Sequence, residues 1–213
     1  MAITDYIEWA LAKALYSSRG HDAGIFTRTP PFKDIPENLT ITSPDNGPSG
    51  SKLKPEFTQV GPDRFPTLTW IPPSDIQIAE YILICEDVDA PLPQPIVHGL
   101  FWGIPGTVTK VTDEDIQLKN LAEGKQGGIK AGWVIGRNRK GTHYFGAKPL
   151  LEHGTHRYFF EVVALEDKIE RDELEKDLEE NMTKEELVKR IDGKVVGWGN
   201  WVGEFERRWG EKH

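Results

Sequence analysis

Two aspartates follow a strongly apolar segment of the chain directly. Residues 79–91 read AEYILICEDVDAP, so Asp87 and Asp89 come where the apolar run ends. In an extended chain, residues two apart point to the same side, so these carboxylates could lie together while Val88 packs on the opposite side. Two like charges at this spacing raise the pKa of at least one carboxyl unless a cation or donor lies nearby. His98, at the start of the run HGLFWGI, is a candidate for that partner. The alternative is that the Asp-Ala-Pro triplet opens a turn and that the aspartates accept hydrogen bonds from loop amides.

A second group of polar side chains lies in residues 144–158, YFGAKPLLEHGTHRY. His156 and Tyr158 share one face of an extended strand, and Arg157 points to the other face. An imidazole, a phenol and the glycine amides of the preceding loop would form a small pocket rich in hydrogen-bond donors, which suits an oxyanion or a phosphate. The alternative is a buried tyrosine and histidine that hydrogen-bond to each other or to the loop backbone.

Other kinds of reactive site find little support in the sequence. Four of the six histidines, His98, His143, His153 and His156, lie in or near these two groups, but no close histidine pairing such as HExxH is present, so we expect no metal. There is no P-loop, no GxGxxG after a strand and no GxSxG elbow, and we expect no cofactor. Cys85 lies within an apolar run that raises the pKa of a thiol, which indicates a core side chain rather than a nucleophile.

Apolar patterns predict the elements that position these residues. Ile7, Leu11 and Leu15 predict an amphipathic helix within residues 1–18. Residues 19–65 are dense in Pro, Gly, Ser and Thr and predict brief strands joined by turns. Apolar runs of strand length predict central strands at 68–71, 79–86, 98–104 and 156–165. The proline-rich 91–95 must be a loop, because proline cannot donate to a sheet, and the glycine-rich 120–150 predict a long loop over the sheet.

The acidic charge is concentrated near the C-terminal end. Residues 167–192 hold eleven acidic and six basic side chains. An apolar stripe over 174–182 predicts one helix, and a capping box of Thr183 and Glu186 predicts the start of a second. The charges then form a solvated helix face, and residues 193–213 predict a closing strand and tail.

Length and composition limit the classes of protein that remain. The chain has 213 residues, 38% of them hydrophobic and 28% charged, which is typical of a globular protein with one domain over residues 1–213. No apolar run approaches the roughly 20 residues of a membrane helix. The net charge of −8 disfavours nucleic acid and anionic membranes as partners. One cysteine cannot form an internal disulfide, and the acidic residues Asp5 and Glu8 do not fit a secretory signal, so we expect a cytoplasmic protein.

The motifs, taken in order, resemble the phosphatidylethanolamine-binding protein family, which includes Raf kinase inhibitor protein, florigen-type proteins and the yeast carboxypeptidase Y inhibitor. The residues that carry the resemblance are Asp87-Val88-Asp89-Ala90-Pro91, His98 in VHGLFWGIPG, Gly136-x-Asn138 before Tyr144-x-Gly146, and Gly154-Thr155-His156-Arg157-Tyr158. The N-terminal helix followed by RGHDAGIFTRTP is similar to the filamentous-fungal branch.

This resemblance implies a β-rich (α+β) fold with two antiparallel sheets, Greek-key connections, and N-terminal and C-terminal helices at the periphery. The β core would span residues 19–165. The resemblance also implies a small cavity that binds an anion such as phosphate, a carboxylate or a phospholipid headgroup. The residues expected to bind that ligand are Asp87, Asp89, His98, Tyr144, Gly146, His156 and Tyr158.

The sequence departs from the family pattern at three places. Val88 replaces the usual proline, Gly99 replaces the aromatic residue that often follows the histidine, and residues 147–149 replace a proline-rich turn. We expect the loss of the aromatic side chain to widen the cavity and Lys148 to add positive charge at its rim. Lys148 belongs to a local basic group with Lys130, Arg137, Arg139 and Lys140.

Three functions are compatible with these features. The first is binding of an anionic small molecule, coupled to control of a partner such as a kinase, a protease or a biosynthetic enzyme. The second is an enzyme or accessory protein of fungal specialised metabolism that forms carbon–carbon bonds on anionic intermediates, as in maleic anhydride dimerisation in maleidride pathways. His98 or His156 would then be the general acid or base and Asp87 would tune it. The third is inhibition of a serine carboxypeptidase through the N-terminal helix and surface loops.

Overall fold

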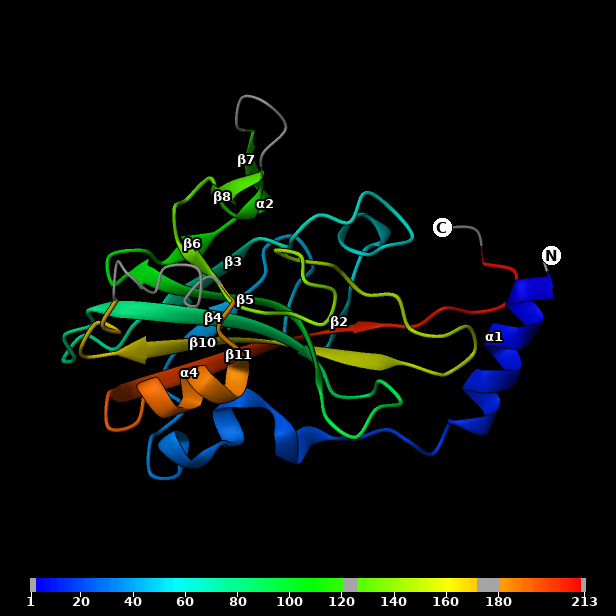
Figure 1. Ribbon diagram of the computed structural model, residues 1–213, viewed down its shortest axis with the longest axis horizontal. Coiled ribbons are helices and arrows are strands. Elements are labelled where there is room, and N and C mark those ends of the chain that lie inside the picture. The colour runs from blue at the N-terminus through cyan, green and yellow to red at the C-terminus, as the bar shows by residue number, and fades with distance from the viewer. Residues whose placement is uncertain (1–2, 121–125, 172–180, 212–213) are drawn as a thin grey trace.

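The computed structural model describes residues 3–120, 126–171 and 181–211. Its largest element is a six-stranded sheet in the order β2-β11-β10-β4-β5-β9 (Figure 1). Neighbouring strands are antiparallel except for β2, which pairs in parallel with β11. The strands are β2 (Ser51–Lys52), β4 (Glu80–Asp87), β5 (Ile96–Pro105), β9 (Val134–Ile135), β10 (His156–Leu165) and β11 (Val195–Phe205).

A smaller antiparallel sheet packs against one face of the large sheet. Its order is β1-β3-β6, and a separate hairpin pairs β7 with β8. The bounds are β1 (Thr40–Thr42), β3 (Leu68–Ile71), β6 (Lys110–Val111), β7 (Leu118–Asn120) and β8 (Gln126–Ile129). The β-rich class predicted with two sheets is therefore confirmed, with the parallel β2 edge as a difference.

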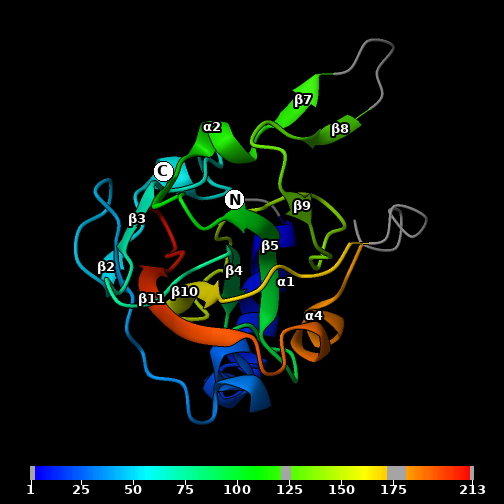
Figure 2. The ribbon, with the colours of Figure 1, turned by 90° about the vertical axis from the view of Figure 1, so that its left-hand side faces the viewer.

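Two hydrophobic clusters hold the layers together. All eight residues of β4 are buried, as expected of a central strand with both faces covered. The cluster between the two sheets includes Trp70, Phe101, Phe160 and Trp201. The opposite face packs on Phe26 and other residues of the segments shown below the sheet in Figure 2.

Helices occupy the periphery. They are α1 (Ile3–Ala14), α2 (Asp113–Ile116), α4 (Lys184–Arg190) and the 3-10 helices η1 (Asp22–Gly24), η2 (Phe26–Arg28), η3 (Pro30–Phe32) and η4 (Pro55–Phe57). The predicted capping box is present, because Glu186 N donates to Thr183 Oγ1 at 3.2 Å and Thr183 N donates to Glu186 Oε2 at 2.8 Å. The helix predicted over 174–182 falls mostly outside the described residues.

The N-terminal helix α1 lies at one end of the large sheet (Figure 1). Ala12 is its buried residue, and Glu8 pairs with Arg207. Ile7 and Leu11, which predicted the helix, are 56% and 51% exposed. The helix therefore docks through Ala12, through polar contacts of Glu8 and Lys13 and through the Tyr6 ring against Trp209, and not through the apolar stripe.

The prediction of one long loop over 120–150 is wrong in part. Strand β8 forms a hairpin there, and β9 pairs with β5. Both strands are too short to show a period in the sequence. A side chain at Gly136 would approach Leu100 Cδ2 at 2.5 Å, so a glycine is needed where the chain continues beside β5 after β9. Among the described residues, no helix is long and apolar enough to span a membrane.

Candidate anion site

Four predicted site residues meet where β4 ends and β5 and β10 begin. Asp87 and Tyr158 are register partners on β4 and β10, and His156 begins β10. His98, on β5, packs edge to face against Tyr158 with ring centroids 5.2 Å apart. All four side chains are buried, with residue exposures between 1% and 4%.

Asp87 closes a turn and also contacts a histidine. Its Oδ1 accepts hydrogen bonds from the backbone N–H groups of Asp89 at 2.9 Å and Ala90 at 3.1 Å. Its Oδ2 lies 2.8 Å from His156 Nδ1. The turn that the sequence offered as an alternative is therefore present, and it holds the carboxylate in place for His156.

A second imidazole extends this contact. His156 Nε2 lies 2.7 Å from His153 Nδ1, and His153 Nε2 lies 3.1 Å from the Leu15 carbonyl oxygen. Burial lowers the pKa of His153, so its ring is neutral and its Nε2–H donates to Leu15. His153 Nδ1 then accepts from His156, which needs protons on both ring nitrogens to donate also to Asp87. Hydrogen-bond counting thus gives Asp87, His156 and His153 three protons together, so the three side chains carry no net charge as a group.

His98, the histidine on β5, is neutral. Its Nδ1–H donates to the Phe145 carbonyl oxygen at 2.7 Å, and the Phe145 ring lies against the imidazole with centroids 4.2 Å apart. Burial lowers the pKa of His98 despite the nearby Asp87 charge, so the ring is neutral at pH 7. The lone pair of Nε2 is then available, and no described residue donates a hydrogen bond to it.

The Tyr158 hydroxyl is a buried donor without a partner in normal hydrogen-bond geometry. Burial raises its pKa well above the usual value, and the adjacent Asp87 charge raises it further. Tyr158 therefore keeps its proton. A proton-accepting nitrogen and a proton-donating hydroxyl lie in the same buried cluster.

Asp89 lies elsewhere, and the prediction that it shares a side with Asp87 is wrong. The chain bends after Asp87, and Asp89 accepts hydrogen bonds from Gly20 N at 3.1 Å and from Arg157 N and Nε at 2.9 and 2.8 Å. Burial favours the neutral carboxyl, but the bonds from Arg157 outweigh it and hold the pKa of Asp89 below its usual value. Arg157 also binds Asp22 through both terminal nitrogens, so Asp89 fastens the N-terminal segment to β10.

Tyr144 and Gly146 take structural positions beside the cluster. A side chain at Gly99 would meet Tyr144 Cδ2 at 3.0 Å and Phe101 Cε2 at 3.1 Å. The Tyr144 ring thus fills the space that Gly99 leaves, and the expected widening is absent. Gly146 N donates to Asp63 Oδ1 at 2.9 Å. This hydrogen bond fixes the loop that contains Gly146.

The positive charge near His98 comes from Lys140. Its ammonium lies 4.6 Å from the centre of the Phe145 ring, which itself packs on His98. Lys148, which the sequence placed at the rim, is exposed.

The chain is similar to several proteins of known sequence or structure. The sequence pattern of the phosphatidylethanolamine-binding protein family matches residues 43–206. The chain belongs to this family. One relative, phomoidride biosynthesis cluster protein B of Talaromyces stipitatus, is 44% identical over 95% of this chain and 82% of its own length. A protein of the same name from Fungal sp. is 36% identical over 99% of both chains. Among solved structures, Escherichia coli YbcL, a member of the family, superposes with a TM-score of 0.62 at 24% identity over 79% of this chain and 98% of its own.

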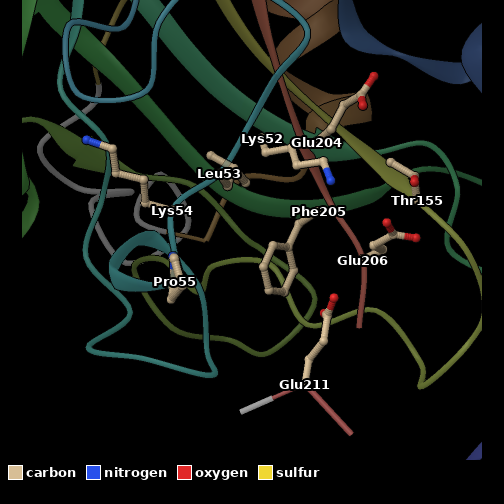
Figure 3. Close-up of a pocket in the computed structure, with 9 residues that line it drawn as sticks. All are labelled: Lys52, Leu53, Lys54, Pro55, Thr155, Glu204, Phe205, Glu206 and Glu211. Carbon is tan, nitrogen blue, oxygen red and sulfur yellow. The ribbon is translucent and has the colours of Figure 1, made fainter. Parts of the chain in front are cut away.

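In this family member, two cavities are lined by neighbours of the cluster residues, and none of Asp87, His98, His156 and Tyr158 is among the described residues that line them. One, of about 550 Å³, lies beside Phe205, the register partner of His156, and beside Thr155. Figure 3 shows the Phe205 ring in this cavity between Pro55 and Glu206. The other, of about 700 Å³, is lined by Tyr144 and Trp133.

A buried charged cluster, which sequence reasoning missed, lies on the other face of the sheet. Lys184 Nζ binds Glu86 Oε1 at 2.6 Å and the Gly24 carbonyl oxygen at 2.7 Å. Glu161 accepts from Thr27 N at 2.8 Å, and burial with the nearby Glu86 raises its pKa well above the usual value. These contacts fasten α4 and the 3-10 segment to the sheet. No three His, Cys, Asp or Glu side chains of the described residues are placed to hold a metal ion.

Proposed function

We propose that this protein binds an anionic small molecule, a carboxylate intermediate of fungal specialised metabolism, at the site formed by His98 and Tyr158. The observation that carries the proposal is the Tyr158 hydroxyl, which is buried beside the Asp87 carboxylate but has no partner in normal hydrogen-bond geometry. A buried donor left unsatisfied costs about 1–3 kcal/mol, and an oxygen atom of a ligand would remove that cost.

The neutral state of His98 determines how an anion is bound. A lone pair on Nε2 repels a carboxylate, so His98 takes up a proton when the anion binds and then donates to it. The Asp87–His156 pair contributes no net charge, which leaves the new imidazolium to balance the ligand. Binding should therefore strengthen as the pH falls.

The second candidate function is catalysis on the same ligand class, and the neutral His98 favours it. Nε2 can accept a proton from carbon next to a carbonyl group, while Tyr158 donates a hydrogen bond to the developing enolate oxygen. The resulting carbon nucleophile would add to an electrophilic carbon of a second molecule, and the proton on His98 would return to the oxyanion formed. The names of the two fungal relatives support a role in a biosynthetic pathway.

Calorimetric titration tests the binding proposal. The ligands are maleate, succinate, an alkylated maleate, inorganic phosphate and phosphorylethanolamine, the last two representing a phospholipid headgroup. Tyr158→Phe removes only the hydroxyl, and Tyr81→Phe is its control, because the Tyr81 hydroxyl is also buried but lies beside Trp70.

We expect a dicarboxylate to bind the wild type and Tyr81→Phe equally and to bind Tyr158→Phe at least tenfold more weakly. A ligand present at 100 times its Kd should also raise the free energy of unfolding by about 2.7 kcal/mol. Equal affinity of wild type and Tyr158→Phe would contradict the proposal, as would a preference for phosphorylethanolamine.

A further inference from the structure

His153 connects the proposed anion site to the N-terminal helix. It belongs to the loop before β10 and is fully buried. Its Nδ1 faces His156 Nε2 at 2.7 Å, and its Nε2 lies 3.1 Å from the carbonyl oxygen of Leu15, the residue that follows α1. Both ring nitrogens of this imidazole therefore have a fixed partner, one in the site and one in the N-terminal segment.

Other contacts hold the N-terminal segment against this loop. Figure 1 shows α1 at the end of the large sheet where β10 begins. The Leu151 N–H donates to Glu8 Oε1 at 3.1 Å, and the Tyr16 ring packs edge-on against the His153 ring with centroids 6.2 Å apart. The N-terminal segment is thus part of the wall that buries His153.

The groups around His153 leave its ring neutral. Burial lowers the pKa of His153, and the nearby His156 and Arg19 lower it further, while the Leu15 carbonyl oxygen and the Asp87 carboxylate act in the opposite direction. A neutral ring whose Nε2–H donates to Leu15 has its lone pair on Nδ1. His156 must then carry a proton on Nε2.

This proton on His156 Nε2 decides the charge of the site. When it is present, Asp87, His156 and His153 share three protons and carry no net charge. Without an acceptor at the position of His153 Nδ1, the N–H would be a buried donor without a partner, which favours its loss. His156 would keep its other proton for Asp87 Oδ2, and the site would gain one negative charge beside Tyr158. That charge would repel an anionic ligand.

We propose that His153 is a positioning residue with two separable roles. Its Nδ1 lone pair holds the proton on His156 Nε2, and its Nε2–H fastens the end of α1 to the loop before β10. The effect on ligand binding rests on the proposed function. The proton on His156 and the anchoring of α1 need no ligand.

Two substitutions separate these roles. In His153→Asn, Oδ1 takes the place of Nδ1 and accepts from His156, but no group reaches Leu15. In His153→Gln, the amide N–H takes the place of Nε2–H and donates to Leu15, but no acceptor stands at the position of Nδ1. The same two substitutions at His143, a partly buried histidine outside the cluster, serve as controls.

Three measurements on the full chain report the roles. Nitrogen-15 NMR of the ligand-free protein at pH 7.5 shows which ring nitrogens carry protons. Hydrogen exchange at the Leu151 amide, which donates to Glu8 in α1, reports the anchoring of the helix. Calorimetric titration with an alkylated maleate reports binding. In the wild type, His156 Nε2 should be protonated and His153 Nδ1 unprotonated.

We expect opposite patterns from the two variants. His153→Gln should move the His156 Nε2 resonance to the unprotonated position and weaken the ligand at least fivefold, while exchange at Leu151 changes less than twofold. His153→Asn should leave the resonance and the affinity near their wild-type values and speed exchange at Leu151 at least fivefold. The controls should change none of these readouts.

Three results would overturn the proposal. They are a protonated His153 Nδ1 in the wild type, a His156 Nε2 that stays protonated in His153→Gln, and equal effects of the two substitutions on every readout. A wild type that binds none of the anions would instead contradict the proposed function, and the two ligand-free measurements would still decide the role of His153.

Discussion

His153 Nδ1 and His156 Nε2 lie 2.7 Å apart, so one proton lies between two buried imidazole rings. The Asp87 carboxylate and the Leu15 carbonyl oxygen accept hydrogen bonds at the two ends of this pair. Three N–H bonds are therefore needed, one more than two neutral imidazoles supply. The extra proton gives the pair a single positive charge beside Asp87.

Removal of the Asp87 charge should lower the free energy of unfolding by more than a substitution at an exposed position does. Asp87→Asn leaves a buried positive charge without its partner, and we expect the free energy of unfolding to fall by about 3 kcal/mol. Urea denaturation at pH 7 measures this. The control Asp34→Asn, at an exposed position, should change the value by less than about 0.5 kcal/mol. A loss below 1 kcal/mol in Asp87→Asn would contradict the ion pair.

The two buried glutamates should respond differently to the same substitution. Burial and the nearby Glu86 raise the pKa of Glu161 and favour its protonated form, so Glu161→Gln should change the free energy of unfolding by less than about 1 kcal/mol. Glu86→Gln removes the carboxylate from a Lys184 ammonium that is 8% exposed, and we expect a loss of about 3 kcal/mol. Chemical denaturation of both variants decides the matter. Equal losses would mean that the two carboxyls share the charge.

Stability should depend on pH through His98. Its pKa is lowered by burial, so near pH 6 the unfolded chain binds a proton at this residue that the folded chain does not. The stability that His98 contributes is fully present above its pKa in the unfolded chain, about 6.5 for an ordinary histidine. This stability is lost as the pH falls toward the lower pKa that His98 has in the folded chain. The pKa values of His143 and His153 are also lowered and act in the same direction.

A comparison of variants isolates the contribution of His98 to this pH dependence. The fall in the free energy of unfolding between pH 7.5 and pH 5.5 should be smaller in His98→Asn than in wild type. An unchanged fall would show that His98 is protonated equally in both states.

Arg157 should be irreplaceable by lysine. Its fork binds Asp22 and Asp89 at once, which a single ammonium cannot do. We expect Arg157→Lys to lower the free energy of unfolding by about 2 kcal/mol. Hydrogen exchange at the Gly20 amide, which donates to Asp89, should become faster. Arg28→Lys, at an exposed position, serves as the control. Unchanged protection of Gly20 would show that Arg157 does not hold this segment.

The sequence predicts the framework better than the contacts within it. Alternation and apolar runs place β4, β5 and β10, and the period-two rule separates Arg157 from His156. The same rule fails for Asp89, because the chain bends directly after Asp87 and leaves the extended conformation that the rule requires.

Contacts between distant segments are the part that local patterns do not show. His153 is only a nearby histidine in the sequence, and its role depends on Leu15, 138 residues away. The Glu86–Lys184 pair and the Tyr144 ring over Gly99 also join segments far apart in the chain. Each of these contacts depends on how the helices and strands pack together. The spacing of apolar residues along one segment does not show that packing.

The proposed function depends on an anion that binds against Nε2 of His98. Nitrogen-15 NMR of histidine-labelled protein, titrated with an alkylated maleate at pH 7.5, tests it most directly. When the ligand is added, the Nε2 resonance of His98 should move from the unprotonated toward the protonated position, while those of His156 should not move. A His98 resonance that stays unchanged while the same ligand saturates the protein would contradict the claim.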